Sequence, residues 1–541
     1  MTTLDPRHLT TFRSIFGGWL LKFLLTFLAA KMIASASWAV AKTHERWPAC
    51  TGTSTLQQLS FVHVSDVHAQ YNPETDGATP VGRIRGYYEA VKKENPYTVF
   101  TDGGDDYEKG SVAEEFSRGQ STRDVVKALA YDVRTLGNHD FAWGIEELMR
   151  FSDDPRAVVL SANSRLVGES GAALAKGKQG RQPWTDYAEL QVGCVKIGFF
   201  GLTTRPYDST GRQHDGPIYP EHPALESDYD HLSIARQIIK EHRQEVDLLV
   251  LVSHLGITDD ILLAEGTDGI DLILGGHSHT VLDKAIQVKT TQIIHPGSNA
   301  EYIGRYDLQY DLKNRVIAES SYRLVENLPG VIAGSDRIDR AVADILHRYR
   351  PPLDETVAAV KKVHGRPEIA KIAALAAASR PGVDAAFVSP ASVWQDNWRG
   401  GLTRQDLFDT FKVEREPVGT TGSSSLYLMR VKGADLLLAR QVLRDFAYSG
   451  PEKIADCDFY TVAVQKAQAL RQENFFGRPI SLLPPQPAAE LWETVAAFAL
   501  DRGIHGLTLD GETLSIGDAP SLFAGAGERP YLPGDGRQPR S

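Results

Sequence analysis

Side chains that can bind metals or transfer protons recur in short segments of this sequence, each directly after a hydrophobic run. In chain order, the candidates are Asp66, His68, Asp105, Asn138, His139, His254, His277 and His279. Carboxylate and imidazole groups suit divalent ions such as Mn, Zn, Fe or Co. The segments contain no cysteine, which argues against a thiolate zinc site. The set is large enough for two ions, and a carboxylate would bridge them because both of its oxygens can bind. Such a pair, about 3.5–4 Å apart, activates water and neutralises charge on a phosphoryl oxygen.

The spacing of the candidates predicts how the chain presents them. Asp66 and His68 are two residues apart, so at the end of a strand their side chains point to the same side. His277 and His279 have the same spacing, and the two preceding glycines permit a tight loop. The runs 248–252 and 270–274 are short, branched and apolar, which predicts buried strands. We therefore expect the candidates on loops that follow buried strands.

The order of these motifs resembles that of a known family. The succession D-x-H, G-D, G-N-H, H and G-H-x-H is similar to that of the calcineurin-like metallophosphoesterases. Residues 198–204, GFFGLTT, resemble a stretch of the 5′-nucleotidase branch, which also includes the thiosulfohydrolases of bacterial sulfur oxidation. The resemblance covers roughly residues 56–325 and continues more weakly through most of the remainder.

The resemblance implies a role for each candidate. One ion would be held by Asp66, His68, Asp105 and His279. The second would be held by Asp105, Asn138, His254 and His277, so that Asp105 bridges. His139 would not bind metal but would protonate the leaving group as a general acid.

One departure from the branch concerns His139. The branch has E-F-D after this histidine, and the aspartate orients the imidazole. Here Asp140, Phe141 and Ala142 follow, so alanine stands at the position of that aspartate. A histidine acid works best when a second group fixes its tautomer. Either another carboxylate does so, or His139 is a weaker acid.

The second half of the sequence differs from the 5′-nucleotidase branch more than the first half does. The branch has an N-G-G-G-I-R run whose arginine helps to bind the substrate, whereas Trp394 stands at that position here. Arg399 is a nearby candidate replacement. The branch also stacks a nucleobase between two aromatic rings, for which Phe475 and Phe476 are the candidates because such stacking is worth roughly 1–3 kcal/mol per base. The alternative is that these two phenylalanines belong to the core.

The length and net charge of the chain limit the classes of molecule that it can bind. A chain of 541 residues exceeds what one core supports, and its net charge of −11 argues against a nucleic-acid polymer as partner. We expect a small phosphorylated substrate, with a nucleotide as one candidate.

The N-terminus and the cysteines bear on localisation. A basic leader, a short apolar run and small residues near positions 36 and 41 predict a signal peptide over residues 1–41 and a periplasmic or otherwise exported protein. The alternative is an uncleaved membrane anchor. Cys50, Cys194 and Cys457 give no disulfide framework, although one pair can form in an oxidising compartment. We expect Cys194 to be a small buried thiol at a strand or hairpin edge.

The expected fold class is α/β with two domains. The resemblance implies a two-sheet αββα sandwich over residues 56–330. A linker helix follows within 331–355, then a second α/β domain over 356–517 and an irregular tail over 518–541. Alternation of strands and helices alone would fit a doubly wound sheet equally well.

Three functions remain open from the sequence. The first is hydrolysis of a phosphate monoester by a two-metal centre, of the 5′-nucleotidase type. The second is a related hydrolase acting on a cyclic nucleotide, another phosphodiester or a sulfur ester. The Ser389–Pro390 pair favours the sulfur ester, and the intact Asn138–His139 motif argues against it. The third is a non-catalytic metal-binding protein, against which the complete ligand set argues.

Overall fold

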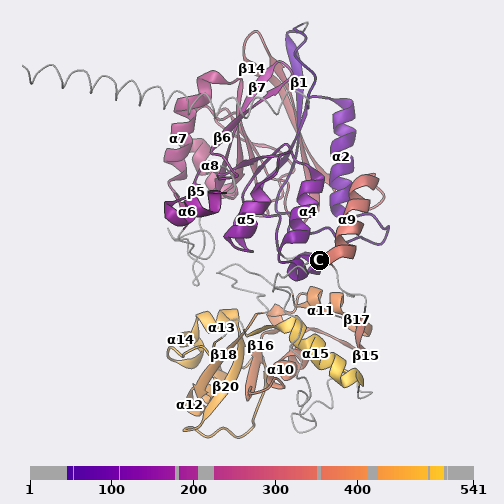
Figure 1. Cartoon of the computed structure of the whole chain (residues 1–541), viewed down its shortest axis with the longest axis vertical. Helices are drawn as coiled ribbons and strands as arrows, with labels where there is room; N and C mark the ends of the chain where they lie inside the picture. Colours follow the sequence, from indigo (N-terminus) through magenta and orange to yellow (C-terminus); the bar gives the residue numbers. More distant parts are fainter. Residues whose placement is uncertain are drawn as a thin grey trace, which may run out of the picture.

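The computed structural model describes residues 46–52, 54–108, 110–176, 182–204, 224–349, 355–395, 397–411, 425–484, 488–504 and 508–509. The expected leader, residues 1–41, and the expected tail, residues 518–541, lie outside these ranges. Figure 1 shows two bodies stacked along the long axis of the molecule, the first ending with helix α9 (Asp336–Tyr349). Among the described residues, no helix is both long and apolar enough to cross a membrane.

The first domain is built on two six-stranded sheets, with strand orders β14-β13-β1-β2-β3-β4 and β11-β12-β10-β9-β7-β6. The strands of the first sheet are β1 (Leu56–Val64), β2 (Thr98–Asp102), β3 (Val133–Thr135), β4 (Val158–Leu160), β13 (Tyr302–Asp311) and β14 (Val316–Glu326). Those of the second are β6 (Tyr187–Val192), β7 (Val195–Thr203), β9 (Leu248–His254), β10 (Leu272–Gly275), β11 (Ile286–Val288) and β12 (Thr291–Ile294). In each sheet four consecutive strands run parallel: β1 to β4 in the first, and β7, β9, β10 and β12 in the second. Their carboxyl ends therefore lie along one edge of each sheet.

Apolar side chains from both sheets form the central core. Phe61 of β1 and Phe199 of β7 meet there edge to face, with ring centroids 6.4 Å apart. Helices α2 (Pro80–Glu94), α4 (Gln120–Leu129), α5 (Ile145–Ser152) and α9 cover the outer face of the first sheet. Helices α7 (His231–His242) and α8 (Ile257–Gly266) cover the second. The αββα sandwich expected from the sequence is confirmed.

Local sequence explains several element boundaries. Helix α2 begins at Pro80, because proline suits the first turn of a helix and the Thr79 side chain caps it by accepting the N–H of Gly82. Strand β9 is buried along its whole length, as a continuous apolar run in a parallel sheet requires. Helix α9 lies within residues 331–355, where a linker helix is expected. Its apolar face, which includes Ile338 and Val342, packs into the outer cluster of the first domain.

The second domain has a five-stranded sheet of order β19-β16-β20-β18-β21. Its strands are β16 (Ala385–Val388), β18 (Ser425–Lys432), β19 (Ala447–Ser449), β20 (Phe459–Gln465) and β21 (Ala489–Glu490). Helices α10 (Arg366–Ala378) and α15 (Leu491–Ile504) pack on one face, and α12 (Gly433–Val442) packs on the other. A separate ribbon pairs β15 (Thr356–His364) with β17 (Trp398–Thr403).

A short helix of the first domain, α3 (Val112–Ser117), touches the second domain. Val112 belongs to the same buried cluster as α10 and α15, and the ring of Phe116 lies edge to face on Trp492 with centroids 5.8 Å apart. These two apolar residues are four apart, so they lie on one face of α3. Through this contact the second domain packs against the segment that follows Asp105 of the G-D motif.

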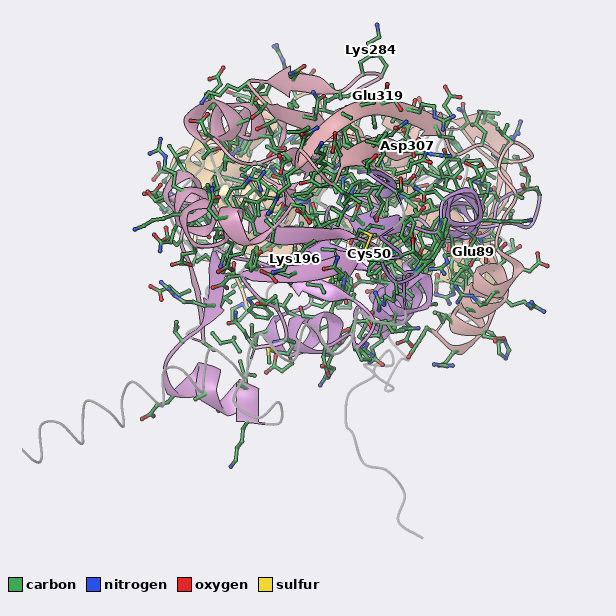
Figure 2. All side chains as sticks on the ribbon, turned by 90° about the horizontal axis from the view of Figure 1, so that it is seen from above. Cys50, Glu89, Lys196, Lys284, Asp307 and Glu319 are labelled. Atoms are coloured by element: carbon green, nitrogen blue, oxygen red, sulfur yellow. A yellow bond between two sulfur atoms is a disulfide. The ribbon has the colours of Figure 1, made fainter. Side chains whose placement is uncertain are left out.

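A disulfide joins Cys50 to Cys194 across a sequence separation of 144 residues. The bond, visible in Figure 2, links the segment before β1 to the β6–β7 turn. Beside it, Trp47 is buried and donates its indole N–H to the Thr98 carbonyl at 2.8 Å. The expectation of a buried Cys194 thiol was wrong, since a sequence spacing cannot show that these two chain segments meet.

We expect loss of this disulfide to destabilise the first domain. Closing so long a loop restricts the unfolded chain, and removal of such a bond typically costs about 2–4 kcal/mol. Cys194→Ser should therefore lower the urea midpoint of unfolding, and a reductant should lower that of the parent protein equally. The exposed free Cys457 provides the control: Cys457→Ser should leave the midpoint unchanged. An unchanged midpoint for Cys194→Ser would contradict the assignment.

Candidate active site

The expected ligands lie together where the parallel strands of both sheets end. Asp66 and His68 follow β1, Asp105 follows β2, Asn138 and His139 follow β3, His254 ends β9, and His277 and His279 follow β10. All are buried except the last two histidines, which are more accessible. Carboxyl ends of parallel strands are common binding sites because the loops there converge. The structure thus brings together all the candidates that the sequence singled out.

The backbone at this edge has an unusual conformation. Positive φ angles occur at Asp66 (53°), His68 (50°), Asp105 (60°), His277 (72°) and His279 (54°). Residues other than glycine rarely adopt such angles, and they persist where the surrounding structure imposes them, often at functional sites. Because these angles are concentrated at the candidate ligands, the surrounding structure holds the backbone of these residues in the positions that bring their side chains together.

A first cluster contains Asp66, His68 and His279, whose ligand atoms all lie within 4.8 Å of one another. The Nε2 atoms of the two histidines are 3.2 Å apart, and Nε2 of His279 is 3.3 Å from Oδ1 of Asp66. Imidazole nitrogens and a carboxylate oxygen that converge in this way fit a divalent ion of the kind expected.

A second cluster contains Asp105, His254 and His277, again with ligand atoms within 4.8 Å. Nε2 of His254 lies 3.0 Å from Oδ2 of Asp105 and 3.2 Å from the amide oxygen of Asn138. A carboxylate oxygen of Asp105 also lies within 4.8 Å of a ring nitrogen of His68, in the first cluster. Asp105 therefore lies close to residues of both clusters, in the position expected for a bridging ligand.

Backbone carbonyls fix the orientation of two of these histidines. Nδ1 of His68 is 2.9 Å from the Tyr107 carbonyl, and Nδ1 of His254 is 2.6 Å from the Gly103 carbonyl. Each Nδ1–H donates to its carbonyl, which leaves Nε2 as the coordinating atom. Metal-binding histidines typically have such a partner.

The histidines and the buried carboxylates also shift each other's pKa values. Burial by itself would raise the pKa of Asp66, but the hydrogen bond with His279 and the charge of His254 outweigh it, so the pKa lies below its ordinary value. Burial would likewise lower the pKa of His254, but the charge of Asp105 and the hydrogen bond with it raise that pKa to about 9. The carboxylates are therefore held as anions, the form that binds a cation.

Two glycines permit the close approach of these loops. A Cβ atom at Gly137 would collide with the carboxylate of Asp105, and one at Gly276 would collide with the side chain of Ser65. Only glycine fits at either position without displacing its neighbour.

His139 faces the same space without belonging to the expected ligand sets. Its Nε2 is 4.0 Å from Oδ2 of Asp105, and its ring stands perpendicular to that of His68 with centroids 4.9 Å apart. Its backbone N–H donates to Oδ1 of Asp105 at 2.7 Å. This position suits a group that transfers a proton at the metal centre.

The opposite ring nitrogen of His139 meets a carboxylate that sequence reasoning missed. Nδ1 lies 2.5 Å from Oε2 of Glu108, and both side chains are buried. The carboxylate of Asp140 is engaged elsewhere, since it accepts the backbone N–H groups of Gly137, Asp105 and Asp106 at 2.8, 3.2 and 3.0 Å. In the sequence, the only indication that Glu108 could lie at the site is that it closely follows the G-D motif.

The expected substrate residues of the second domain lie on two different elements, Phe475 and Phe476 on α14 (Gln472–Phe476) and Arg399 on β17. Phe476, at the end of α14, is buried in the cluster beneath α12, so its ring is not available for stacking. Phe475 is half-buried against the same cluster. Arg399 is exposed on β17. Phe476 therefore takes the core position that the sequence left open as the alternative to stacking on a base.

Comparison with known proteins identifies the first domain. A family model described as calcineurin-like phosphoesterase matches residues 59–281, a range that contains every candidate ligand. The first domain is a calcineurin-like phosphoesterase domain. This confirms the resemblance inferred from the motif order, and the ligand clusters agree with the divalent metals that phosphoesterases of this family use.

The relatives of the phosphoesterase domain extend the comparison. The rat 5′-nucleotidase is 24% identical over 342 residues, which cover 57% of this chain and 54% of that protein. The chain thus spans about half of the length of this curated relative. A 5′-nucleotidase precursor from Thermus thermophilus superposes with a TM-score of 0.60 at 19% identity, covering 82% of this chain and 96% of the other. A sulfate thiohydrolase from the same species superposes with a TM-score of 0.56 at 16% identity, covering 82% and 94%. These structures share the two-domain fold.

Proposed function

We propose that the chain is a hydrolase of phosphate esters that depends on two divalent metal ions, most consistent with a 5′-nucleotidase-type phosphomonoesterase. The observation that carries this proposal is the pair of ligand clusters with Asp105 between them. The phosphoesterase family match and the nucleotidase relatives support it. The complete ligand set argues against a protein that binds a metal without catalysis.

The residues divide into two ligand sets and an acid. One ion would be held by Asp66, His68, Asp105 and His279, and the second by Asp105, Asn138, His254 and His277. When bound, such a pair of ions activates water and neutralises charge on the phosphoryl group. His139 faces the same space through Nε2 and would donate the proton that the leaving oxygen needs.

Substrate identity belongs to the same proposal. A small phosphorylated molecule, with a nucleotide as the first candidate, agrees with the nucleotidase relatives. Export is proposed as well: a disulfide between Cys50 and Cys194 is expected in an oxidising compartment, and the Thermus thermophilus neighbour is a precursor. Whether residues 1–41 are cleaved or anchor the chain concerns a segment outside the described residues.

A second candidate is hydrolysis of a different ester. It is favoured by Trp394, which is exposed at the position expected for the substrate-binding arginine, and by the burial of Phe476. A sulfur ester, or a phosphodiester that lacks a nucleobase, would not need those two groups. The fold is compatible with a sulfur ester, since it is shared with a sulfate thiohydrolase.

A substrate panel separates the candidates. The purified chain, loaded with Mn²⁺, would be assayed with AMP, a 2′,3′-cyclic nucleotide, bis-p-nitrophenyl phosphate, p-nitrophenyl phosphate and an organic thiosulfate. We expect hydrolysis of the phosphomonoesters, with AMP preferred, and loss of activity with a chelator. Selective diester or thiosulfate hydrolysis would support the second candidate. Metal binding without turnover of any substrate would overturn both.

A further inference from the structure

We propose that Glu108 is the positioning residue for His139, in place of the carboxylate that is absent at position 142. The proposal rests on the proposed function of His139 as the acid. Oε2 of Glu108 lies 2.5 Å from Nδ1, while Nε2 on the other side of the ring faces Asp105 at 4.0 Å. Glu108 thus holds the imidazole at Nδ1, and Nε2 faces the proposed metal centre.

Glu108 is itself held rigidly. It is a buried residue with a φ of 69°, and its backbone N–H donates to both carboxylate oxygens of Glu114, at 2.9 and 3.1 Å. The Glu114 carboxylate also accepts from the indole N–H of Trp143 at 2.7 Å and from the Thr122 hydroxyl at 2.5 Å. These contacts hold the backbone of Glu108 in place, so its side chain starts from a defined position, unlike that of a solvated surface glutamate.

The neighbouring carboxylate cannot take this role. The oxygens of Asp140 accept three backbone N–H groups of the loops around Gly137 and Asp105, and Ala142 has no polar group to offer. The Glu108 carboxylate faces Nδ1 directly. A carboxylate there accepts the Nδ1–H, sets the tautomer and stabilises the protonated ring, which is what a histidine acid requires.

The kinetic test uses a double-mutant cycle. Glu108→Ala should lower kcat by up to the roughly 10²–10⁴-fold that loss of a general acid costs, while KM and metal content stay unchanged. In the His139→Ala background, Glu108→Ala should cause no further loss, because its effect passes through the histidine. Glu146→Ala, an exposed carboxylate at the start of α5, is the matched control and should leave kcat unchanged.

Moving the carboxylate provides a rescue. Position 142 follows the short 3₁₀ turn His139–Phe141, and side chains three residues apart in such a turn lie on the same side. Ala142→Asp alone should change kcat little, since Glu108 already orients the ring. In the Glu108→Ala background, Ala142→Asp should recover about tenfold of the loss. A purely structural role of Glu108 would not be restored from position 142.

A spectroscopic readout does not depend on turnover. With ¹⁵N-labelled histidine, the Nδ1–H signal of His139, assigned by its loss in His139→Ala, should be protected from solvent exchange in the parent protein. It should be lost in Glu108→Ala and return when Ala142→Asp is added. If the signal follows this pattern but no substrate is turned over, the proposed function fails while the positioning role stands. Additive loss in the cycle, or an unaltered signal in Glu108→Ala, would overturn the proposal.

Discussion

Asp105→Asn is expected to abolish binding of both metal ions and, with it, hydrolysis. Asp105 stands between the clusters of His68 and His254, so its loss weakens both sites, whereas Asp66 belongs to one cluster only. Asparagine keeps the shape but removes the charge and one of the two oxygen ligands. The fall in activity should exceed the roughly 10–100-fold typical of an outer partner of a metal ligand.

Metal content per chain, measured by mass spectrometry after equilibration with excess Mn²⁺ and removal of the unbound metal, tests this prediction. Asp105→Asn should retain no tightly bound ion, and Asp66→Asn should retain one. Asp268→Asn is the matched control, since its carboxylate is exposed and contacts Lys289. Two ions retained by Asp105→Asn would refute the bridging assignment.

The second large effect is expected at His139. His139→Ala should lower kcat for an alkyl phosphate such as AMP by roughly 10²–10⁴-fold, the range for loss of a general acid. The loss should be much smaller for p-nitrophenyl phosphate, because nitrophenolate leaves without needing a proton. Plotting kcat against the pKa of the leaving group for both proteins measures this difference directly.

Metal content distinguishes an acid from a ligand at this position. A ring nitrogen of His139 lies within 4.8 Å of ligand atoms of His68 and Asp105. If His139 is the acid, His139→Ala binds both ions as the parent protein does. Loss of one ion, together with an equal fall in kcat for both leaving groups, would instead make His139 a ligand.

The side chains that converge at the candidate site and much of the fold could be predicted from the sequence. The run before His254 is apolar throughout because β9 is buried on both faces, and it ends in a ligand because the strand ends at the site. Such a pattern is local, and the order of several of them is specific enough to imply the αββα sandwich. Helix α9 was predictable from its apolar periodicity and the prolines that follow it.

Other features depend on contacts between segments far apart in the chain. The Cys50–Cys194 bond, the burial of Trp47 and the packing of α3 on Trp492 all join such segments. Phe476 illustrates the same limit: an aromatic pair on a short helix fits a stacking platform and a core equally well, and only the packing around α12 decides between them.

The sequence by itself determined which side chains are available for chemistry at the candidate site, because residue type and spacing are properties of single segments. The tertiary structure decided how the ring of His139 is oriented. Ala142 leaves His139 without the carboxylate expected at that position. Glu108 contacts the ring from a backbone with a positive φ, whose N–H donates to the Glu114 side chain. Backbone conformations of that kind are imposed by surrounding packing, so residue types and spacing alone do not specify them.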